Sequence, residues 1–260
     1  MIVYELDDVW VMTAQDDHAR FSGAAAGFWK DESLTGSVLY EDVRLAIQEH
    51  DRGWIPLDVH PMWNDREQRP YSFRDLPVGL KLPYYRQGVD EVQERNEYAA
   101  LLNSLHYASF FHEDRIGGLG DIEKDGVDRF LAWEQQRRGA IKAGNGWTGE
   151  EAGKDIAYHL EVLQFCDTLS LFVSLQEPGE PLRFYAGGFA ETFHFLGRQK
   201  IRASWEDRET VRLTPSPLVE GASGSFRFKE VPKASAREKG IGAAYRETPW
   251  RERMIRFTGA

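Results

Sequence analysis

An adjacent histidine and aspartate, His50 and Asp51, are residue types that could bind a metal ion together. They follow an apolar-periodic segment over residues 38–47, which predicts an amphipathic helix ending in a glycine cap at Gly53. Neighbouring helical residues point about 100° apart, so both side chains reach one point only beside the end of the helix. An imidazole nitrogen and a carboxylate oxygen at one point commonly hold a divalent cation. The alternative is a helix C-terminus with a polar pair, in which His50 complements the helix dipole.

His18 is a second candidate ligand, near the start of another predicted helix. Thr13 and Asp16 have the spacing of a capping box, and apolar residues recur through about Trp29. The first turn lies at the positive end of the helix dipole, which disfavours a protonated histidine. A neutral imidazole is the form that ligates metals. An exposed first-turn histidine without a role is the alternative.

His106 is a third candidate and lies in a predicted helix over residues 89–111. It shares a stripe with Leu102 and Phe110, so its side chain is expected to face an interior or a pocket. A main-chain carbonyl that satisfies a core histidine is the alternative to a metal.

Asp167 falls in the middle of the most apolar predicted helix, over residues 150–174. Leu163 and Leu171 lie on the same stripe, so the carboxylate is expected to be buried. A buried, unpaired carboxylate is costly and must be protonated, paired or bound to a cation. A hydrogen bond to a buried hydroxyl or a salt bridge to an arginine is the alternative.

The segment from Ile55 to Gly88 is rich in proline and aromatic residues and reads as irregular. It is too long for an ordinary connector and too hydrophobic for a free linker. Long ordered loops in compact domains usually serve function. The segment is therefore predicted to form a lid or a pocket wall, with Trp54, Asp58 and Tyr85 as candidate substrate-binding residues.

The composition is that of a globular protein with an acidic surface. Apolar residues make up 42% of the 260 residues, and the formal net charge is −10. This charge disfavours nucleic acid and anionic membranes as partners, although a bound cation would create a local anion site. The single cysteine, Cys166, cannot form an internal disulfide and suits a reducing cytosol. Without a signal-peptide pattern or a membrane-spanning apolar run, the chain is predicted to be cytoplasmic and to act on a small molecule.

Strand-like alternation dominates the part of the chain after Pro178. Residues 210–213, 225–228 and 254–257 alternate apolar and basic side chains, and a hairpin is also plausible near the N-terminus, over residues 2–12. The C-terminal strands are expected to form a small antiparallel sheet packed on the helices. The expected organisation is a helical metal-binding domain over residues 1–178 and a β-rich extension over residues 179–260, or a single domain that includes both.

The order of the candidates along the chain resembles the signature of the HD-domain superfamily of metal-dependent phosphohydrolases. That signature is a histidine on one helix, a His-Asp pair at the end of another, and an aspartate on a much later helix; His18, His50, Asp51 and Asp167 match it. The sequence around these positions also resembles a family of uncharacterised bacterial proteins over most of the chain. The resemblance implies a mainly α fold, an HD-domain-like helical bundle with a small C-terminal antiparallel β element.

The resemblance further implies a cation bound by His18, His50, Asp51 and Asp167. Members of the superfamily with two metals add further histidines, and His106 is the candidate for that role, with Asp51 bridging. No second extra histidine is clearly matched, and the lysine and Gly-Tyr-Pro motifs of some branches are absent near Asp51. One or two divalent transition-metal ions are therefore expected, and mixed imidazole and carboxylate ligands suit Mn, Fe, Co, Ni or Zn.

The chemistry that follows is metal-dependent hydrolysis, with a small phosphorylated metabolite or a nucleotide as the expected substrate. A bound cation lowers the pKa of a water and polarises a phosphoryl oxygen. Gln15, close to His18, is the candidate for orienting the water or a substrate oxygen, and Asp51 is the other catalytic candidate. Two alternatives stay open: a di-iron oxygenase of the HD type, and a non-catalytic protein that binds a metal or small molecule. The sequence does not indicate the oligomeric state.

Overall fold

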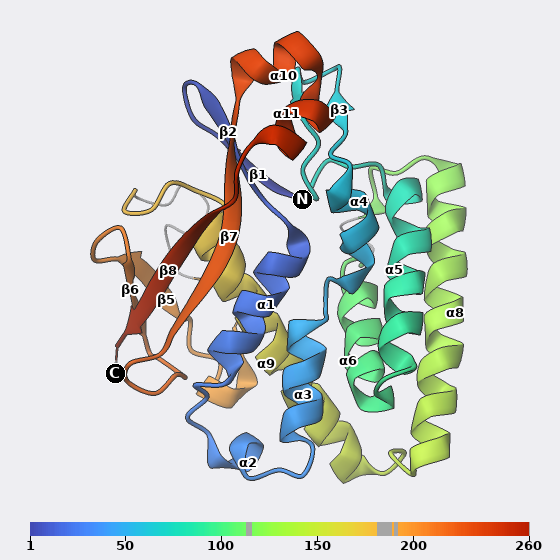
Figure 1. Cartoon of the computed structure of the whole chain (residues 1–260). Coiled ribbons are helices and arrows are strands. Elements are labelled where there is room, and N and C mark those ends of the chain that lie inside the picture. The colour runs from blue at the N-terminus through green and yellow to red at the C-terminus, as the bar shows by residue number, and fades with distance from the viewer. Residues whose placement is uncertain (113–115, 181–188, 190–191, 260) are drawn as a thin grey trace.

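A curled sheet of six strands forms one side of the molecule in the computed structural model (Figure 1), which describes residues 1–112, 116–180, 189 and 192–259. The strand order is β1-β2-β7-β8-β6-β5. β6 and β8 pair in parallel and all other neighbours are antiparallel, so the sheet is mixed and has the form of a half-barrel. The strands are β1 (Ile2–Glu5), β2 (Val9–Thr13), β5 (Arg202–Trp205), β6 (Thr210–Thr214), β7 (Ser223–Pro232) and β8 (Arg251–Thr258).

Alternation of apolar and polar residues decides which face of each strand is buried. In β6, Val211 and Leu213 are buried, whereas Arg212 between them is exposed. Helix α1 (Gln15–Ala26) packs against β7 on the buried face (Figure 1), where the ring of Phe21 lies over Gly224. A Cβ atom at Gly224 would come within 3.0 Å of that ring, so the glycine permits the close approach.

Two groups of helices lie beside the sheet. The inner group is α1, α3 (Tyr40–Gln48) and α9 (Glu150–Ser174), and both α3 and α9 pack against α1. The outer group consists of α5, α6 and α8, which lie side by side on the far side from the sheet (Figure 1), and α6 contacts the inner group. The outer helices are α5 (Val78–Gln93), α6 (Glu97–Ala108) and α8 (Asp121–Asn145).

The remaining elements are short. A two-stranded sheet, β3 with β4, lies near the N-terminal end of β1, and α10 and α11 pack on β7 beyond the end of the large sheet (Figure 1). These elements are α2 (Glu32–Thr35), η1 (Arg52–Trp54), α4 (Ile55–Val59), β3 (Trp63–Asn64), β4 (Arg69–Pro70), η2 (His194–Leu196), α10 (Lys233–Lys239) and α11 (Ile241–Glu247).

The expected mainly α bundle with a small C-terminal antiparallel element is wrong. About 52% of the chain is helical and 17% is in strands, and the large mixed sheet makes the fold α/β. The segments over residues 210–213, 225–228 and 254–257 do lie in strands, as predicted. Local alternation does not reveal that β2 pairs with β7, some 220 residues further along the chain, with Trp10 opposite Val231. The division at residue 178 stays a prediction, and the sheet takes strands from both sides of it.

One predicted helix end and one predicted irregular segment are also wrong. The helix before the His-Asp pair ends at Gln48 rather than at a cap on Gly53, which instead lies in η1. The segment over residues 55–88 is not irregular, because it contains α4, the β3–β4 hairpin and the first part of α5. Pro83 lies inside α5, where a proline normally argues against a helix.

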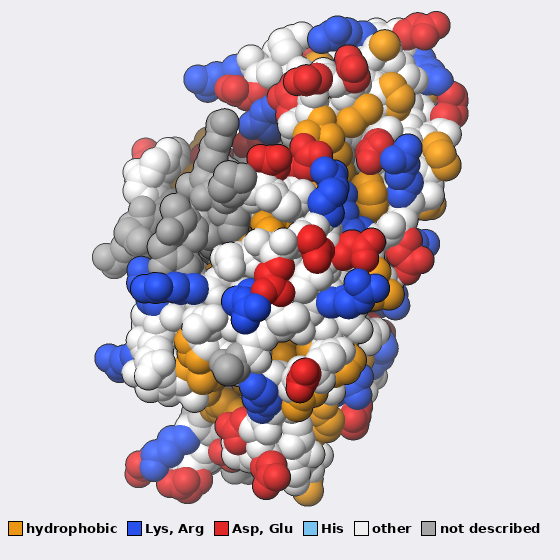
Figure 2. Space-filling view, turned by 90° about the vertical axis from the view of Figure 1, so that its left-hand side faces the viewer, with side chains coloured by type: hydrophobic (Ala, Val, Ile, Leu, Met, Phe, Trp, Pro, Cys, Tyr) orange, Lys and Arg blue, Asp and Glu red, His pale blue; other side chains and the backbone are white. Residues whose placement is uncertain are grey.

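Figure 2 views the molecule from the side of the sheet and shows acidic and basic side chains interspersed over this face. At the sheet, Arg256 of β8 forms an ion pair with Glu209, the residue before β6. Among the helices that the structure describes, none combines the length and apolar character that a bilayer crossing requires.

Candidate metal centre

Five candidate residues, which lie far apart in the sequence, meet in the interior. His18 lies in the first turn of α1, Asp167 in α9 and His106 in α6. His50 and Asp51 lie in the turn between α3 and η1, beyond the end of the helix, as the convergence of the two side chains requires. The side chains of His18, His50, Asp51 and His106 are at most 5% exposed, and that of Asp167 is 14% exposed.

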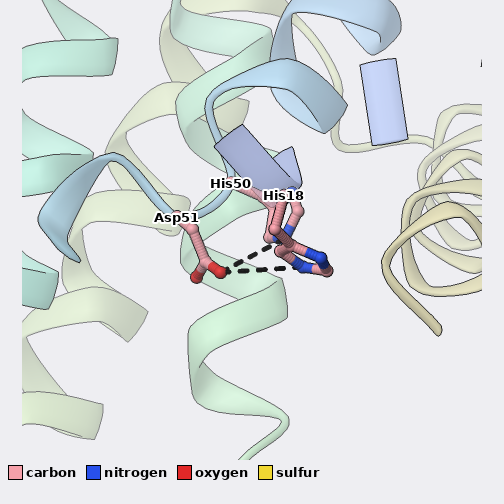
Figure 3. A group of neighbouring side chains, drawn as sticks. All are labelled: His18, His50 and Asp51. Carbon is pink, nitrogen blue, oxygen red and sulfur yellow. Dashed lines mark ion pairs between the residues drawn. The ribbon is translucent and has the colours of Figure 1, made fainter. Parts of the chain in front are cut away.

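Short distances join the ring nitrogens to the two carboxylates. His18 Nε2 lies 2.9 Å from Asp167 Oδ1 and 3.9 Å from Asp51 Oδ2. His50 Nε2 lies 3.5 Å from Asp51 Oδ2 and 3.6 Å from Asp167 Oδ1. Figure 3 shows both imidazole rings directed toward the Asp51 carboxylate. The Nε2 atom of each of these two histidines therefore lies within 4 Å of both carboxylates.

These separations fit the coordination shell of one transition-metal ion. Metal bonds to histidine nitrogen and carboxylate oxygen are roughly 2.0–2.2 Å long, so neighbouring ligand atoms lie about 3 Å apart at right angles and about 3.4 Å apart at the tetrahedral angle. The ligand atoms of His18, His50 and Asp51 all lie within 4.8 Å of one another, and so do those of a second, overlapping group, His50, His106 and Asp167. The donor set, imidazole with carboxylate, suits a divalent transition metal.

Hydrogen bonds to main-chain carbonyl oxygens orient the ring of His50 and hold the main chain of His18. His50 Nδ1 donates a hydrogen bond to the carbonyl oxygen of Ile47, 2.7 Å away, which leaves Nε2 directed at the cluster. Ser170 on α9 donates to the carbonyl oxygen of His18 at 3.0 Å, and Ser22 lies 3.1 Å from the same oxygen. The hydroxyl of Ser170 thus joins α9 to the turn of α1 that carries His18.

Burial and the two carboxylates determine the charge state of the cluster without metal. Burial lowers the pKa of His18 more than Asp167 raises it, so His18 is neutral. Burial also disfavours protonated His50, but the charges of Asp51 and Asp167 outweigh it and raise its pKa to about 9. Burial raises the pKa of Asp51 to about 7, whereas contacts with His18 and His50 overcome burial and hold the pKa of Asp167 well below its usual range. The cluster thus favours one positive charge at its centre, which a proton on His50 or a cation can supply.

His106 stands beside this cluster, where its ring packs edge-to-face against that of His50, with centroids 5.2 Å apart. Its Nε2 lies 3.5 Å from Asp167 Oδ2, the oxygen that does not face His18 and His50. Burial lowers its pKa to about 3, so the ring is neutral. Neither ring nitrogen has a hydrogen-bond partner among the described residues. Because Nδ1 of His50 is engaged, His50 can bind only one cation, through Nε2. A second cation at His106 would share Asp167 with the first, through the oxygen Oδ2.

A cavity of about 790 Å³ opens onto the cluster. Asp51, His106 and Asp167 line it, together with Gln15, whose Oε1 is buried and has no hydrogen-bond partner among the described residues. This volume is in the range of small-molecule sites. The walls are largely aromatic and apolar, and include Trp54, Phe73, Leu76, Tyr85, Phe110 and Phe111.

The candidate substrate-binding residues do not all lie in this cavity. Trp54 and Tyr85 line it, with their rings 5.8 Å apart. Asp58 is buried outside it. Its carboxylate accepts a hydrogen bond from the main-chain N–H of Gln15 at 2.6 Å and lies 2.5 Å from the amino group of Met1. Asp58 therefore braces the start of α1, and its role in substrate binding stays a prediction.

Other histidines lie apart from the cluster. Tyr98 Oη lies 2.6 Å from His159 Nδ1, and His194 pairs with Glu161. Sequence reasoning missed three residues that shape the site: Ser22 and Ser170, which hold the main chain of His18, and Lys81, whose side chain lines the cavity. Serines inside helices carry no local signal for such contacts. Lys81 lies in the first part of α5, a segment that the sequence predicts to be irregular.

The molecule is thus an α/β protein with a buried cluster of histidine and aspartate at the floor of a cavity. The chain belongs to a family described as "Protein of unknown function (DUF3891)", whose pattern matches residues 1–232. The resemblance to a family of uncharacterised proteins is therefore confirmed, whereas the HD-domain signature is not shown by this match. No curated protein and no solved structure matches the chain significantly.

Proposed function

We propose that this protein is a metal-dependent hydrolase of small phosphoesters, with one cation held by His18, His50, Asp51 and Asp167. The observation that carries the proposal is the convergence of four ligand atoms, 2.9 to 3.9 Å apart in the pairs described above, at the floor of a cavity. The order of these four residues along the chain also resembles that of the HD phosphohydrolases. A bound divalent cation would activate a water and polarise a phosphoryl oxygen.

The residues around the cation site have separate tasks in this proposal. Asp51 and Asp167 line the cavity and belong to the cluster, so they place the cation where a substrate can reach it. The unpaired Oε1 of Gln15 accepts a hydrogen bond from the attacking water and orients it. His106 is neutral and lies on the cavity wall, where its unpaired ring nitrogens can form hydrogen bonds with the substrate.

A hydrolase with one cation is favoured over a di-iron oxygenase by the ligands available. A second ion would share Asp167 and have His106 as its additional histidine, because the Nε2 of His50 serves the first ion. The unpaired Oε1 of Gln15 and the unpaired ring nitrogens of His106 would serve a bound ligand in a catalytic and in a non-catalytic protein alike, and only an assay of hydrolysis separates the two.

The decisive experiment measures metal content per chain and phosphoester hydrolysis in the same preparations. The protein is incubated with Mn, Fe(II), Co, Ni or Zn, freed of unbound metal, and assayed with 4-nitrophenyl phosphate and bis(4-nitrophenyl) phosphate. Asp167→Asn and Asp51→Asn remove cluster carboxylates. Asp155→Asn is the matched control, since Asp155 is an exposed residue on the same helix as Asp167.

We expect one ion per chain and hydrolysis in the wild type and in Asp155→Asn, and the loss of both in the cluster variants. Equal metal content in all four proteins would overturn the ligand assignment. Absence of metal from the wild type would do the same. One ion per chain without hydrolysis of either ester would overturn the hydrolase and leave a metal-binding protein.

A further inference from the structure

Lys81 is a cation in the cavity that lacks a carboxylate partner. It lies on α5, is partly buried, and donates a hydrogen bond to the carbonyl oxygen of Phe73 at 3.1 Å. Among the residues that the structure describes, no carboxylate oxygen lies within 4.0 Å of its ammonium group. An ammonium group has three donors, so two of them remain for a ligand. Burial lowers the pKa of Lys81, against a smaller opposing effect of Asp75, which reflects the cost of the missing counter-charge.

Two further acidic residues that line the cavity, Asp75 and Glu123, have other partners. Asp75 pairs with Arg69 at 2.7 Å and accepts a hydrogen bond from the amide of Ser72 at 2.7 Å. Glu123 accepts a hydrogen bond from the amide of Gly120 at 3.2 Å, at the start of α8. Neither acid forms an ion pair with the ammonium group of Lys81, so an incoming anion would find two of its donors free.

Lys81 lies on α5, which carries none of the proposed metal ligands. Tyr85, one turn further along this helix, stacks on Tyr107 with ring centroids 4.1 Å apart, and the charge of Asp51 contributes to the raised pKa of Tyr85. The backbone of Lys81 lies about 6 Å along the helix axis from that of Tyr85. Aromatic side chains such as Trp54 and Phe110 occupy the walls of the cavity that both residues share.

We propose that the substrate carries, besides its phosphoester, an apolar and preferably aromatic body and a second anionic group, which Lys81 binds. This inference deepens the proposed hydrolase and rests on it for the identity of the reacting group. The cation site takes the phosphoryl group, the aromatic walls take the body, and Lys81 takes the second anion. A carboxylate or a second phosphate would both satisfy the two remaining donors.

Binding of two stable phosphonates that differ in one carboxylate tests the inference without catalysis. The metal-loaded protein is titrated calorimetrically with phenylphosphonate and with 4-phosphonobenzoate. The variant is Lys81→Gln. Lys30→Gln is the matched control, because Lys30 also donates to a main-chain carbonyl at 3.1 Å, that of Ser216, and does not line the cavity.

We expect the wild type and Lys30→Gln to bind 4-phosphonobenzoate more tightly than phenylphosphonate, by about 10-fold, as one charge-assisted hydrogen bond allows. Lys81→Gln should lose this preference and bind phenylphosphonate as the wild type does. An equal loss for both ligands would show that Lys81 binds the phosphonate itself and would overturn the inference. An unchanged preference in Lys81→Gln would overturn it as well.

Hydrolysis of phenyl phosphate and 4-carboxyphenyl phosphate separates this inference from the proposed function. A KM that rises for 4-carboxyphenyl phosphate alone in Lys81→Gln supports both. If neither ester is hydrolysed but the phosphonate preference depends on Lys81, the hydrolase fails and the anion site stands. If both esters are hydrolysed with the same KM in Lys81→Gln as in the wild type, the hydrolase stands and the anion site fails.

Discussion

The backbones of Gly53 in η1 and Gly88 in α5 are in direct contact, so α5 packs closely against the segment that follows the His-Asp pair. A Cβ atom at Gly88 would lie 2.4 Å from the amide nitrogen of Gly53, and one at Gly53 would lie 2.4 Å from the carbonyl oxygen of Tyr84. Distances this short do not occur for real Cβ atoms, so the two elements meet only because both residues are glycine. The contact brings Tyr85 to the cavity and fixes the position of Asp51 two residues before Gly53.

Gly88→Ala should therefore destabilise the protein although alanine is a better helix former than glycine. We expect a loss of about 1–3 kcal/mol in the free energy of unfolding, measured by urea denaturation, because the helix must move away from η1. Gly139→Ala on α8 is the control, since its Cβ would meet no atom within 4 Å. That variant should gain up to about 1 kcal/mol. A stability gain in Gly88→Ala would contradict the packing described here.

Ser170→Ala should weaken metal binding through the position of His18. The Ser170 hydroxyl donates to the His18 carbonyl oxygen, and its loss should cost about 0.5–1.5 kcal/mol of stability. Ser174→Ala is the control, because Ser174 is equally buried on α9 and donates to a carbonyl of its own helix. We expect similar losses in unfolding free energy but a lower metal affinity, measured by chelator competition, in Ser170→Ala alone. Equal affinities in both variants would show that this hydrogen bond does not position His18.

Metal should raise the stability of the whole fold, since the four ligands come from α1, α9 and the turn after α3. At a free concentration of 100 times the dissociation constant, a cation that binds only the folded chain stabilises it by about 2.7 kcal/mol. Thermal unfolding with and without metal measures this effect. Asp155→Asn should retain the shift in melting temperature, and Asp51→Asn should lose it. The same shift in both variants would place the cation elsewhere.

His106 and His50 should differ in their importance for the first cation. His106 makes no hydrogen bond to the cluster and approaches Asp167 through the oxygen that does not face His18, so His106→Gln should keep one ion per chain with an affinity within about 10-fold of the wild type. His50→Gln should lose the ion, because it removes a nitrogen at the centre of the cluster. Chelator competition and metal content measure the difference. Complete loss of metal from His106→Gln would make His106 a ligand of the first ion.

The sequence by itself determined which residues could bind a metal. His50 and Asp51 are adjacent and follow a predicted helix, so both side chains can reach one point beside the end of that helix. Helical spacing also indicated that His106 and Asp167 face the interior, because the apolar residues around them recur at three- and four-residue steps. The structure places both residues in the wall of the cavity beside the cluster. These properties depend on local order along the chain, which periodicity reports.

Tertiary structure decided what local patterns do not contain. The α/β class follows from pairing β2 with β7, and no local signal specifies a partner at that distance along the chain. The boundaries of α5 were missed because Pro83 and the glycines in it argue against a helix, whereas packing against η1 stabilises it. Only the fold shows that Lys81 lines the cavity without an ion-pair partner among the described residues, because Asp75 and Glu123 have other partners. A residue's type and spacing thus indicate what it can do, and the long-range contacts determine which partners it finds.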